Sequence, residues 1–203
     1  MASRKSSSVV AVLAILALGA YSYHQLRLER QARPLDEARP GQVLSENHFS
    51  PGENLERLDL DRLQSARQSL DIAMYAFTDK YIAETLAGLA ERGVRIRLYR
   101  DRSQYQQEQE NAARYRDAST TDLLRGQANI QIRVKASGRR NLMHLKSYLV
   151  DGALLRDGSA NWSAAGLKRQ DNNAHFTNDP AQVRAFQQAF EAMWEAEANE
   201  IVQ

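Results

Sequence analysis

The sequence predicts an α/β fold in which a mixed β-sheet is flanked by helices, as in a sandwich. Three features of the chain indicate this class. Apolar residues recur at helical spacing in several polar segments, short apolar runs of strand length alternate with those segments, and a final helix is predicted over residues 180–198. The 203 residues suit one domain of average size, and a hydrophobic content of 43% is sufficient for its core.

The predicted elements of the first half follow one another from residue 53. Leu55, Leu58 and Leu63 recur at roughly helical spacing, which predicts a helix over 53–68. The run LDIAMYAF at 70–77 alternates enough to be a buried strand. The elements predicted after it are an amphipathic helix at 80–92, a strand at 94–99, a polar helix or helix pair at 106–125 and a strand at 130–134.

Residues 1–23 have the features of a signal peptide or an N-terminal membrane anchor. Arg4 and Lys5 precede an apolar run that continues to Tyr23, which has the length of a signal-peptide core and is short for a spanning helix. The small residues in this run do not form an Ala-x-Ala site, so an uncleaved anchor is the alternative to a cleaved leader. In either case residues 9–23 provide the means of export or of a membrane tether.

The charges around this run and the segment after it set the expected location and domain boundary. Basic residues nearly balance on its two sides, so the positive-inside rule gives an exported domain, periplasmic or membrane-anchored, a small advantage over one that faces the cytosol. Residues 24–47 are polar, contain Pro34 and Pro40 and show no sustained periodicity, which predicts a linker. We therefore expect the folded domain to span 48–203.

The overall composition does not identify a partner. A formal net charge of +2 neither demands nor excludes a polyanionic substrate, because the local clustering of charge determines binding. The chain has no cysteine, which excludes disulfides, thiolate catalysis and cysteine-based zinc sites.

The segment HLKSYLVDGALLRDGSAN at 144–161 carries the most specific pattern in the chain. Residues 145–150 are mostly apolar, Asp151-Gly152 is a hairpin dipeptide and the apolar run resumes at 153–155. We therefore expect a strand, a tight turn, a second strand and a loop. The specified residues, in the spacing H-x-K-x4-D-x6-G-S-x-N, are His144, Lys146, Asp151, Gly158, Ser159 and Asn161.

These residue types together suit a phosphate group. Side chains two apart on a strand share a face, so His144 and Lys146 can converge on one anion. Gly158 lets the backbone approach closely, and the Ser159 hydroxyl and the Asn161 amide add hydrogen-bond donors. A neutral imidazole is nucleophilic near pH 7, and the lysine ammonium neutralises charge that develops on phosphoryl oxygens. Such chemistry requires no metal and no other cofactor.

The segment resembles the signature of the phospholipase D superfamily, and residues 70–78, 82–94 and 96–102 resemble the first half of its small single-motif branch. That branch includes bacterial periplasmic endonucleases and mitochondrial cardiolipin hydrolases. The resemblance covers roughly residues 49–197 and implies a phospholipase D-like fold. It also implies that the protein cleaves phosphodiesters through a phosphohistidine intermediate.

The resemblance also implies a homodimer, because each subunit has one signature and supplies one histidine. His144 of one subunit would then attack phosphorus while the partner's His144 protonates the leaving oxygen. Asp151 belongs to the implied catalytic signature, although its place in a tight turn also gives it a structural explanation.

One position departs from the family pattern. In much of the family an Asn-x-Glu follows the signature and its carboxylate orients the catalytic imidazole, whereas this chain reads Asn173-Ala174-His175. An imidazole without an orienting acceptor can hold the wrong tautomer, which would reduce activity. His175 and Asp171 are the candidates for the orienting role.

The residues around the signature leave three candidate functions open. The leading one is a metal-independent endonuclease for DNA or RNA, the second is a phospholipase for phosphatidyl headgroups or cardiolipin, and the third is a module that binds nucleic acid without catalysis. Basic residues on both sides of the signature predict a groove for a polynucleotide, with a solvated surface as the alternative for each charge. The predicted groove residues are Arg133, Lys135, Arg139, Arg140, Lys168 and Arg169.

Four further residues are weaker candidates. Tyr148 and Trp162 could offer stacking faces to bases, although a place in the core is the better interpretation of Trp162. His48 could lie near the pocket, and Asp101 follows a predicted strand, where a turn or capping role is the alternative.

Overall fold

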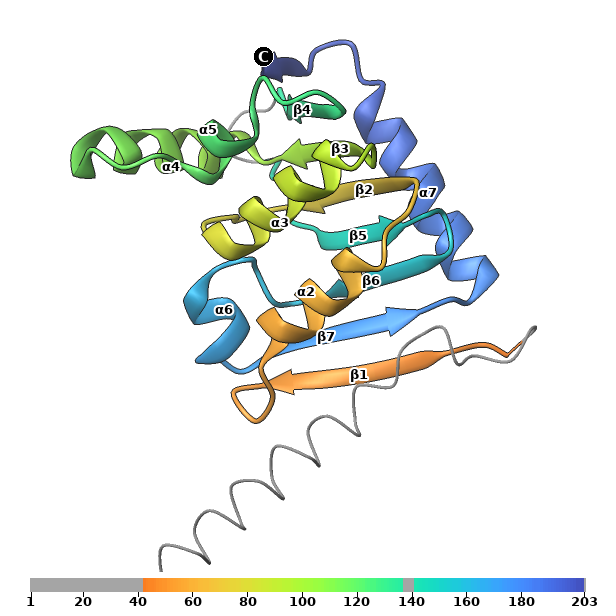
Figure 1. The fold of residues 1–203 in the computed structure, drawn as a ribbon. Helices are drawn as coiled ribbons and strands as arrows, with labels where there is room; N and C mark the ends of the chain where they lie inside the picture. The colour runs from red at the N-terminus through yellow and green to blue at the C-terminus, as the bar shows by residue number, and fades with distance from the viewer. Residues whose placement is uncertain (1–41, 137–140, 203) are drawn as a thin grey trace, which may run out of the picture. The chain divides into compact units, whose positions relative to one another are not determined.

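The computed structural model describes residues 42–136 and 141–202, and these residues form an α/β fold (Figure 1). Within them, one mixed sheet contains eight strands in the order β1-β7-β6-β5-β2-β3-β4-β8. Strands β2 (Ser69–Met74), β3 (Arg95–Arg100) and β4 (Ile130–Val134) run parallel to one another. The remaining pairings are antiparallel. The predicted fold class is confirmed.

The helices cover both faces of this sheet. In Figure 1, α2, α3 and α6 lie over one face, α7 crosses the other, and α4 extends to one side. The helices are α2 (Leu55–Gln64), α3 (Lys80–Glu91), α4 (Arg102–Tyr115), α5 (Thr120–Leu124), α6 (Ala164–Lys168) and α7 (Pro180–Trp194). The remaining strands are β1 (Ser45–Ser50), β5 (Lys146–Val150), β6 (Leu154–Gly158), β7 (Asn172–Thr177) and β8 (Glu200–Val202).

Short polar side chains fix where the longer helices begin. Asn54, Asp79 and Asp101 precede α2, α3 and α4, and each side chain accepts a hydrogen bond from a backbone amide of the first turn. Asp179 does the same for α7, whose first residue is Pro180. Such caps satisfy amide groups that have no partner inside the helix and typically stabilise it by about 1 kcal/mol.

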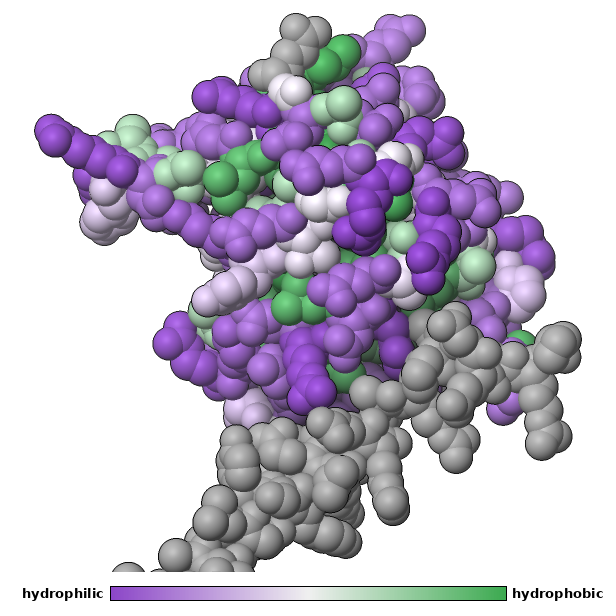
Figure 2. Space-filling model, viewed as in Figure 1, coloured by the Kyte–Doolittle hydropathy of each residue, from purple (hydrophilic) through white to green (hydrophobic). Residues whose placement is uncertain are grey.

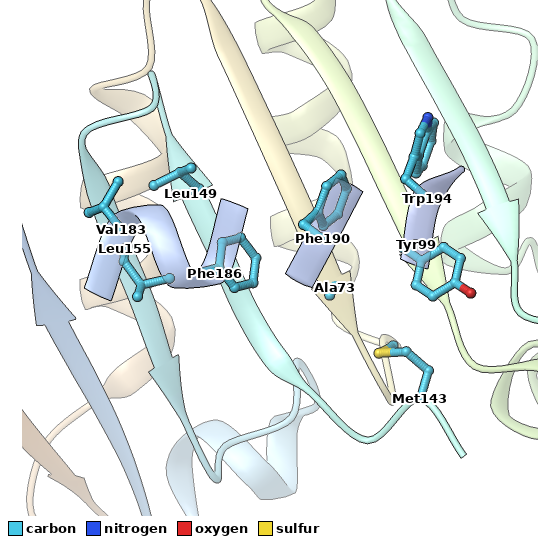
Figure 3. Close-up of a cluster of buried hydrophobic side chains, with 9 residues drawn as sticks. All are labelled: Ala73, Tyr99, Met143, Leu149, Leu155, Val183, Phe186, Phe190 and Trp194. Atoms are coloured by element: carbon cyan, nitrogen blue, oxygen red, sulfur yellow. The ribbon is translucent and has the colours of Figure 1, made fainter. Parts of the chain in front are cut away.

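The core between α7 and the sheet explains why this helix can be predicted from the sequence. Val183, Phe186, Phe190 and Trp194 recur every three or four residues, so they form one face of α7. Figure 3 shows this face packed against side chains of the sheet and of the segment before β5, and each large apolar side chain contributes about 1.5–3 kcal/mol when it is buried. Its partners are Ala73, Tyr99, Met143, Leu149 and Leu155.

Several elements differ from the sequence prediction. The domain forms one compact unit from Val43 onward, so the linker prediction for 24–47 is wrong at residues 45–47, which belong to β1. This strand could not be predicted from its polar sequence SENHFS. It lies at the sheet edge, and its extended conformation depends on pairing with β7. Strands β7 and β8 and the short helix α6 were not predicted either. The predicted helix pair at 106–125 corresponds to α4 and α5.

The side chains on one face of the molecule and the length of its helices bear on how the described residues could meet a membrane. The face drawn in Figure 2 is mostly hydrophilic, with apolar residues scattered over it. Within 42–136 and 141–202, no helix is long and apolar enough to cross a bilayer. The signal or anchor predicted at 1–23 lies outside the described residues.

Candidate active site

The signature segment forms a hairpin. Its open end, opposite the turn, is the candidate active site. Strands β5 and β6 pair antiparallel, and Asp151 and Gly152 connect them with φ values of 50° and 67°. Two successive residues with positive φ are typical of the tight type I′ turn. Since the strands run in opposite directions, the residues before β5 and after β6 lie at the same end of the hairpin. This places His144 and the Gly158–Asn161 loop together, as the sequence predicts.

His144 and Lys146 lie in direct contact at this end. The Lys146 ammonium nitrogen is 3.1 Å from His144 Nδ1 and donates a 2.7 Å hydrogen bond to the His144 carbonyl oxygen. The imidazole is exposed, whereas Lys146 is only 5% exposed. The Tyr75 ring meets the imidazole edge-on at 4.4 Å between centroids, and the Lys146 ammonium lies 4.8 Å from the centre of the same ring. The predicted convergence of the imidazole and the ammonium is present.

The pKa of Lys146 is lowered from the ordinary lysine value. The main cause is burial, which disfavours the charged form, and the second is the nearby positive charge of Arg156. The ammonium is thus held close to other groups rather than solvated, which strengthens its attraction for an anion that enters the site.

Neighbouring elements hold the His144 segment in place. The Met143 amide donates a 3.0 Å hydrogen bond to Asp101, whose buried carboxylate also caps α4. The Tyr75 amide donates to the Leu145 carbonyl oxygen at 2.9 Å. The sequence left open whether Asp101 is a capping residue or lies near the site. In the structure it does both.

The Gly158–Asn161 loop is fixed against β7 and β2. Gly158 has a φ of 142°, and a side chain at this position would collide with the Asn173 carbonyl oxygen, so only glycine fits. The Ser159 hydroxyl donates to the Asn172 side-chain oxygen at 2.9 Å and accepts from the Asn173 amide at 3.0 Å. The Asn161 side-chain oxygen accepts from the Ala76 amide at 3.3 Å, and its NH₂ group donates no hydrogen bond to another described residue, so it stays available as a donor.

Asp151 lies at the turn of the hairpin, at the end opposite His144. Its carboxylate therefore does not reach a phosphate bound at His144. Its carboxylate accepts hydrogen bonds of 2.8 Å from the backbone amides of Arg67, Gln68 and Ser69. These bonds tie the turn to the segment before β2. The structural explanation of Asp151 is therefore correct, and the implied catalytic role does not fit its position.

The two candidates for orienting the imidazole are not in contact with it. His175 lies on β7, where its Nδ1 is 3.1 Å from the Asp157 carboxylate and its Nε2 is 3.0 Å from the Ser45 hydroxyl. Asp171 is exposed beside a separate cavity that Ser159 also lines. Sequence reasoning missed Asn172, which reaches Ser159 from the first position of β7. The register of β7 against β6 pairs Asp157 with His175 and Gly158 with Ala174, which places Asn172 and Asn173 beside Ser159.

A cavity of 580 Å³ opens beside the open end of the hairpin, where β5 begins and β6 ends. His144, Lys146 and Gly158 line one side, and α7 closes the other with Phe186 and neighbouring residues. Helix α7 was not expected at the site, because nothing in its sequence shows where it crosses the sheet. In the part of the chain that the structure describes, no three His, Cys, Asp or Glu side chains are grouped so that they could hold a metal ion.

The described residues of the predicted basic groove do not form one surface. Arg133 lies on β4, with its guanidinium 4.6 Å from the centre of the Trp194 ring, and Lys168 on α6 pairs with Glu56 at 2.7 Å. Strands β5, β2 and β3 separate β6 from β4, whereas α6 packs near α2 and β1, so these two residues lie toward opposite edges of the sheet. Arg169 is exposed after α6, and Lys135 follows β4 and is half-buried. Arg139 and Arg140 lie outside the described residues.

The remaining weaker candidates also find places in the structure. Tyr148 and Trp162 are both fully buried, so the prediction of stacking faces is wrong and the core interpretation of Trp162 is correct. His48 is buried with its Nδ1 2.8 Å from Glu53 and its ring against Phe176, with no contact to the His144 site.

The family comparison agrees with this fold and this signature. The chain matches the model of a family described as "Cardiolipin synthase, PLD-like domain" over residues 60–194. The chain belongs to this phospholipase D-like family. The match contains the whole His144–Asn161 signature, and the resemblance inferred from the sequence is confirmed.

Individual relatives support the same placement. The chain is 30% identical over 136 residues to a mitochondrial cardiolipin hydrolase of Chlamydomonas reinhardtii, with 67% of this chain and 56% of the relative covered. It is 33% identical over 136 residues to the mitochondrial cardiolipin hydrolase of Homo sapiens, with 67% and 49% covered. The chain therefore spans about half the length of these relatives.

Solved structures with a similar fold are much less similar in sequence. NucT from Helicobacter pylori matches with a TM-score of 0.67 and 22% identity, covering 79% of this chain and 99% of that one. Nuc, a phospholipase D family member from Salmonella typhimurium, matches with a TM-score of 0.65 and 21% identity, covering 80% and 99%. These matches establish the common fold.

Proposed function

We propose that this protein hydrolyses phosphodiesters, with His144 as the nucleophile, and that it does so without a metal ion. The observation that carries the proposal is the contact between an exposed imidazole and a buried ammonium, next to the Ser159–Asn161 loop. An enzyme for phosphoryl transfer needs a nucleophile and fixed positive charge or donors for the phosphoryl oxygens. These residues can supply both.

The proposed first step forms a bond between Nε2 of His144 and phosphorus and breaks the bond between phosphorus and the leaving oxygen. In the free protein Lys146 donates to Nδ1, so a neutral ring holds its proton on Nε2. Attack therefore requires the ammonium to move from Nδ1 to a phosphoryl oxygen and the ring proton to shift to Nδ1. Lys146 and the Asn161 NH₂ group would then stabilise the charge on the phosphoryl oxygens. In the second step water attacks phosphorus and gives its proton to the group that protonated the leaving oxygen, and the phosphorus–nitrogen bond breaks to release His144.

We propose that the active unit is a homodimer, because the leaving oxygen needs a proton donor. Neither His48 nor His175 contacts His144 among the described residues, and the partner's His144 is a suitable acid. Leu142 and Leu145 flank His144 with exposed fractions of 42% and 39%. Apolar side chains on both sides of an exposed imidazole support a surface that a second copy covers.

A polynucleotide is the first proposed substrate class. The site is open, with His144 and Ser159 exposed, so a diester inside a long polymer can approach it. Arg169 is exposed after α6 and can contact a flanking phosphate.

A phospholipid is the second proposed substrate class, and a different observation favours it. Leu145, Leu155 and Phe186 give the cavity beside His144 apolar side chains that suit an acyl chain. The two relatives described above are both named cardiolipin hydrolases. A tether through residues 9–23, which we retain as a proposal together with export, would keep the site near a bilayer.

The deciding experiment measures turnover by the full chain in excess EDTA on single-stranded DNA, RNA and cardiolipin vesicles. The His144→Asn variant should lose at least about a thousandfold in turnover, because it removes the nucleophile and keeps a similar size and polarity. The His48→Asn variant is the matched control and should retain turnover. Cleavage of a polynucleotide selects the nuclease, and cleavage of cardiolipin alone selects the phospholipase. Equal turnover by wild type and His144→Asn would contradict the mechanism.

A further inference from the structure

A charged pair lies buried beneath the signature hairpin. Asp59 of α2 and Arg156 of β6 are both completely buried, and the Arg156 Nε is 3.2 Å from the Asp59 carboxylate. Buried charges are costly unless they are paired and hydrogen-bonded, so this arrangement calls for a reason. The proposed chemistry does not use either residue directly.

The Arg156 guanidinium joins the two halves of the signature. One terminal nitrogen donates a hydrogen bond to the backbone carbonyl of Lys146. The other donates to the carbonyl of Ala160 at 3.1 Å. Lys146 belongs to the half with the nucleophile, and Ala160 lies between Ser159 and Asn161 in the half with the loop. One side chain thus links both segments that would contact a phosphoryl group.

The strand pairing explains why such a link is needed. The β5–β6 ladder includes Tyr148 with Arg156 but ends there, so Lys146 and Ser147 have no partner on β6. On its other side, Lys146 is paired with Met74 of β2. The two strands therefore separate where the cavity opens. At that point the Arg156 guanidinium, rather than a backbone amide of β6, donates a hydrogen bond to the Lys146 carbonyl.

Asp59 holds this arginine and the surrounding signature residues from α2. Its carboxylate accepts hydrogen bonds of 3.0 Å from the Tyr148 hydroxyl and 3.0 Å from the Trp162 indole, and a longer one of 3.4 Å from Arg156. Tyr148 is two residues beyond Lys146, and Trp162 follows Asn161. Burial raises the pKa of Asp59, while Arg156 and the two hydrogen bonds act in the opposite direction and favour the carboxylate.

We infer that Asp59 and Arg156 are positioning residues of the candidate active site. They hold the His144–Lys146 segment and the Gly158–Asn161 loop at the separation that a phosphoryl group requires. This inference rests on the proposed phosphodiesterase function. Catalysis depends strongly on such separations, and a displacement of about 1 Å can cost on the order of a hundredfold in rate.

Arg156 also acts on Lys146 through its charge. His144 and Tyr75 contact the Lys146 ammonium, Arg156 acts on it through its charge, and the Asp157 carboxylate lines the same cavity. Arg156 contributes to the lowered pKa of Lys146, after burial. Loss of the guanidinium should therefore raise the pKa of Lys146, which provides a readout that a purely structural role would not move.

The test uses full-length variants that separate geometry from charge. Arg156→Met alone leaves Asp59 buried without its cation and is expected to disrupt folding, so the double variant Asp59→Asn/Arg156→Met removes both charges. Arg156→Lys keeps the positive charge but lacks the fork that reaches two carbonyl groups. The matched control is Glu108→Gln/Arg100→Met, because this buried pair is similar in burial and its partners belong to α4 and α5.

Two quantities are measured on each folded variant. One is turnover of bis(p-nitrophenyl) phosphate in EDTA, and the other is the titration of Lys146 by NMR of ¹³C-labelled lysine side chains. The double variant should lose about a hundredfold in kcat with little change in KM, and its Lys146 pKa should rise. Arg156→Lys should keep the Lys146 pKa but not recover kcat. The control pair should leave both quantities unchanged.

The failure of this inference differs from the failure of the proposed function. A folded double variant with wild-type kcat and a wild-type Lys146 pKa overturns the positioning role. Wild-type protein that cleaves no phosphodiester overturns the proposed function. In that case the positioning role falls with the function, and the Lys146 pKa of the double variant reports only the electrostatic effect of Arg156 on Lys146.

Discussion

The two ends of the β5–β6 hairpin carry residues of the same signature but are built differently. At the turn, the Asp151 carboxylate accepts hydrogen bonds from three backbone amides. At the open end, His144 and Ser159 are exposed. Among the described residues, the Lys146 ammonium makes hydrogen bonds with the His144 ring and the His144 carbonyl oxygen, and it lies over the Tyr75 ring. The Asp151 carboxylate at the turn and the Ser159 hydroxyl are satisfied internally, whereas the His144 imidazole and the Asn161 NH₂ group at the open end can still bind a ligand.

This difference shows how the residues of one signature divide between two tasks. Asp151 ties the turn to the segment before β2. The open end contains the reactive groups and relies on neighbours to hold it, among them Asp101 and Arg156. Changes at the open end should therefore affect activity, and changes at the turn should affect stability.

The largest expected effect is at the open end. Lys146→Met should lower kcat by about a hundredfold to a thousandfold, because it removes the charge that would stabilise the phosphoryl oxygens. The free energy of unfolding should change little or rise, since a partly desolvated ammonium is lost. Steady-state kinetics and urea unfolding measure the two quantities. A variant that loses stability but retains kcat would reverse the assignment.

The turn should show the opposite pattern. Asp151→Ala removes three hydrogen bonds to a charged acceptor and should lower the free energy of unfolding by about 2 kcal/mol. The kcat of the folded fraction should stay near the wild-type value, because the carboxylate does not reach His144. Denaturant titration followed by kinetics below the midpoint tests this, with Asp61→Ala on the solvent side of α2 as a control. A thousandfold loss of kcat in folded protein would restore a catalytic role for Asp151.

The pH dependence should sharpen the role of Lys146. If the protonated ammonium is required, activity is present below the Lys146 pKa and is lost as the pH rises through it. Since burial and Arg156 lower that pKa, the alkaline limb should lie below the ordinary lysine value of 10.5. Lys146→Arg should move the limb to higher pH, because arginine stays charged. A limb that does not respond to this substitution belongs to another group.

The smallest expected effect concerns a charge outside the hairpin. Arg169→Ala should weaken the binding of a single-stranded oligonucleotide by a few-fold and reduce the slope of log K against log salt by about one. His144→Asn protein allows this binding to be measured without cleavage. Lys168→Ala is the comparison, because Lys168 is already paired with Glu56 and should change the slope less. Equal slopes in all three proteins would remove both residues from any nucleic-acid surface.

Much of the fold follows from local sequence. The apolar spacing of α3 and α7 and the apolar runs of β2 and β5 report burial on one face or both, so these elements could be predicted. Strands β1 and β7 could not, because their sequences SENHFS and NNAHFT are largely polar. Their extended conformation depends on hydrogen bonds to a neighbouring strand, and the local sequence pattern does not indicate such bonds.

The candidate site divides in the same way. The spacing of the signature was sufficient to predict the contact of His144 with Lys146 and the placement of the glycine loop, since a short hairpin returns its two ends to one place. The basic groove was predicted from proximity in sequence. Its described residues do not form one surface, because β4 and α6 lie toward opposite edges of the sheet.

The sequence by itself determined the class of fold, the family and the residues that meet at the open end of the hairpin, because these depend on short-range periodicity and on one local turn. Only the tertiary structure decided which distant groups support them. Asp59, Asp101 and Asn172 come from α2, the end of β3 and β7, and each reaches the signature through side-chain contacts between segments far apart in the chain. Such contacts depend on strand order and helix packing, which are set by the burial of the whole sheet rather than by any single segment.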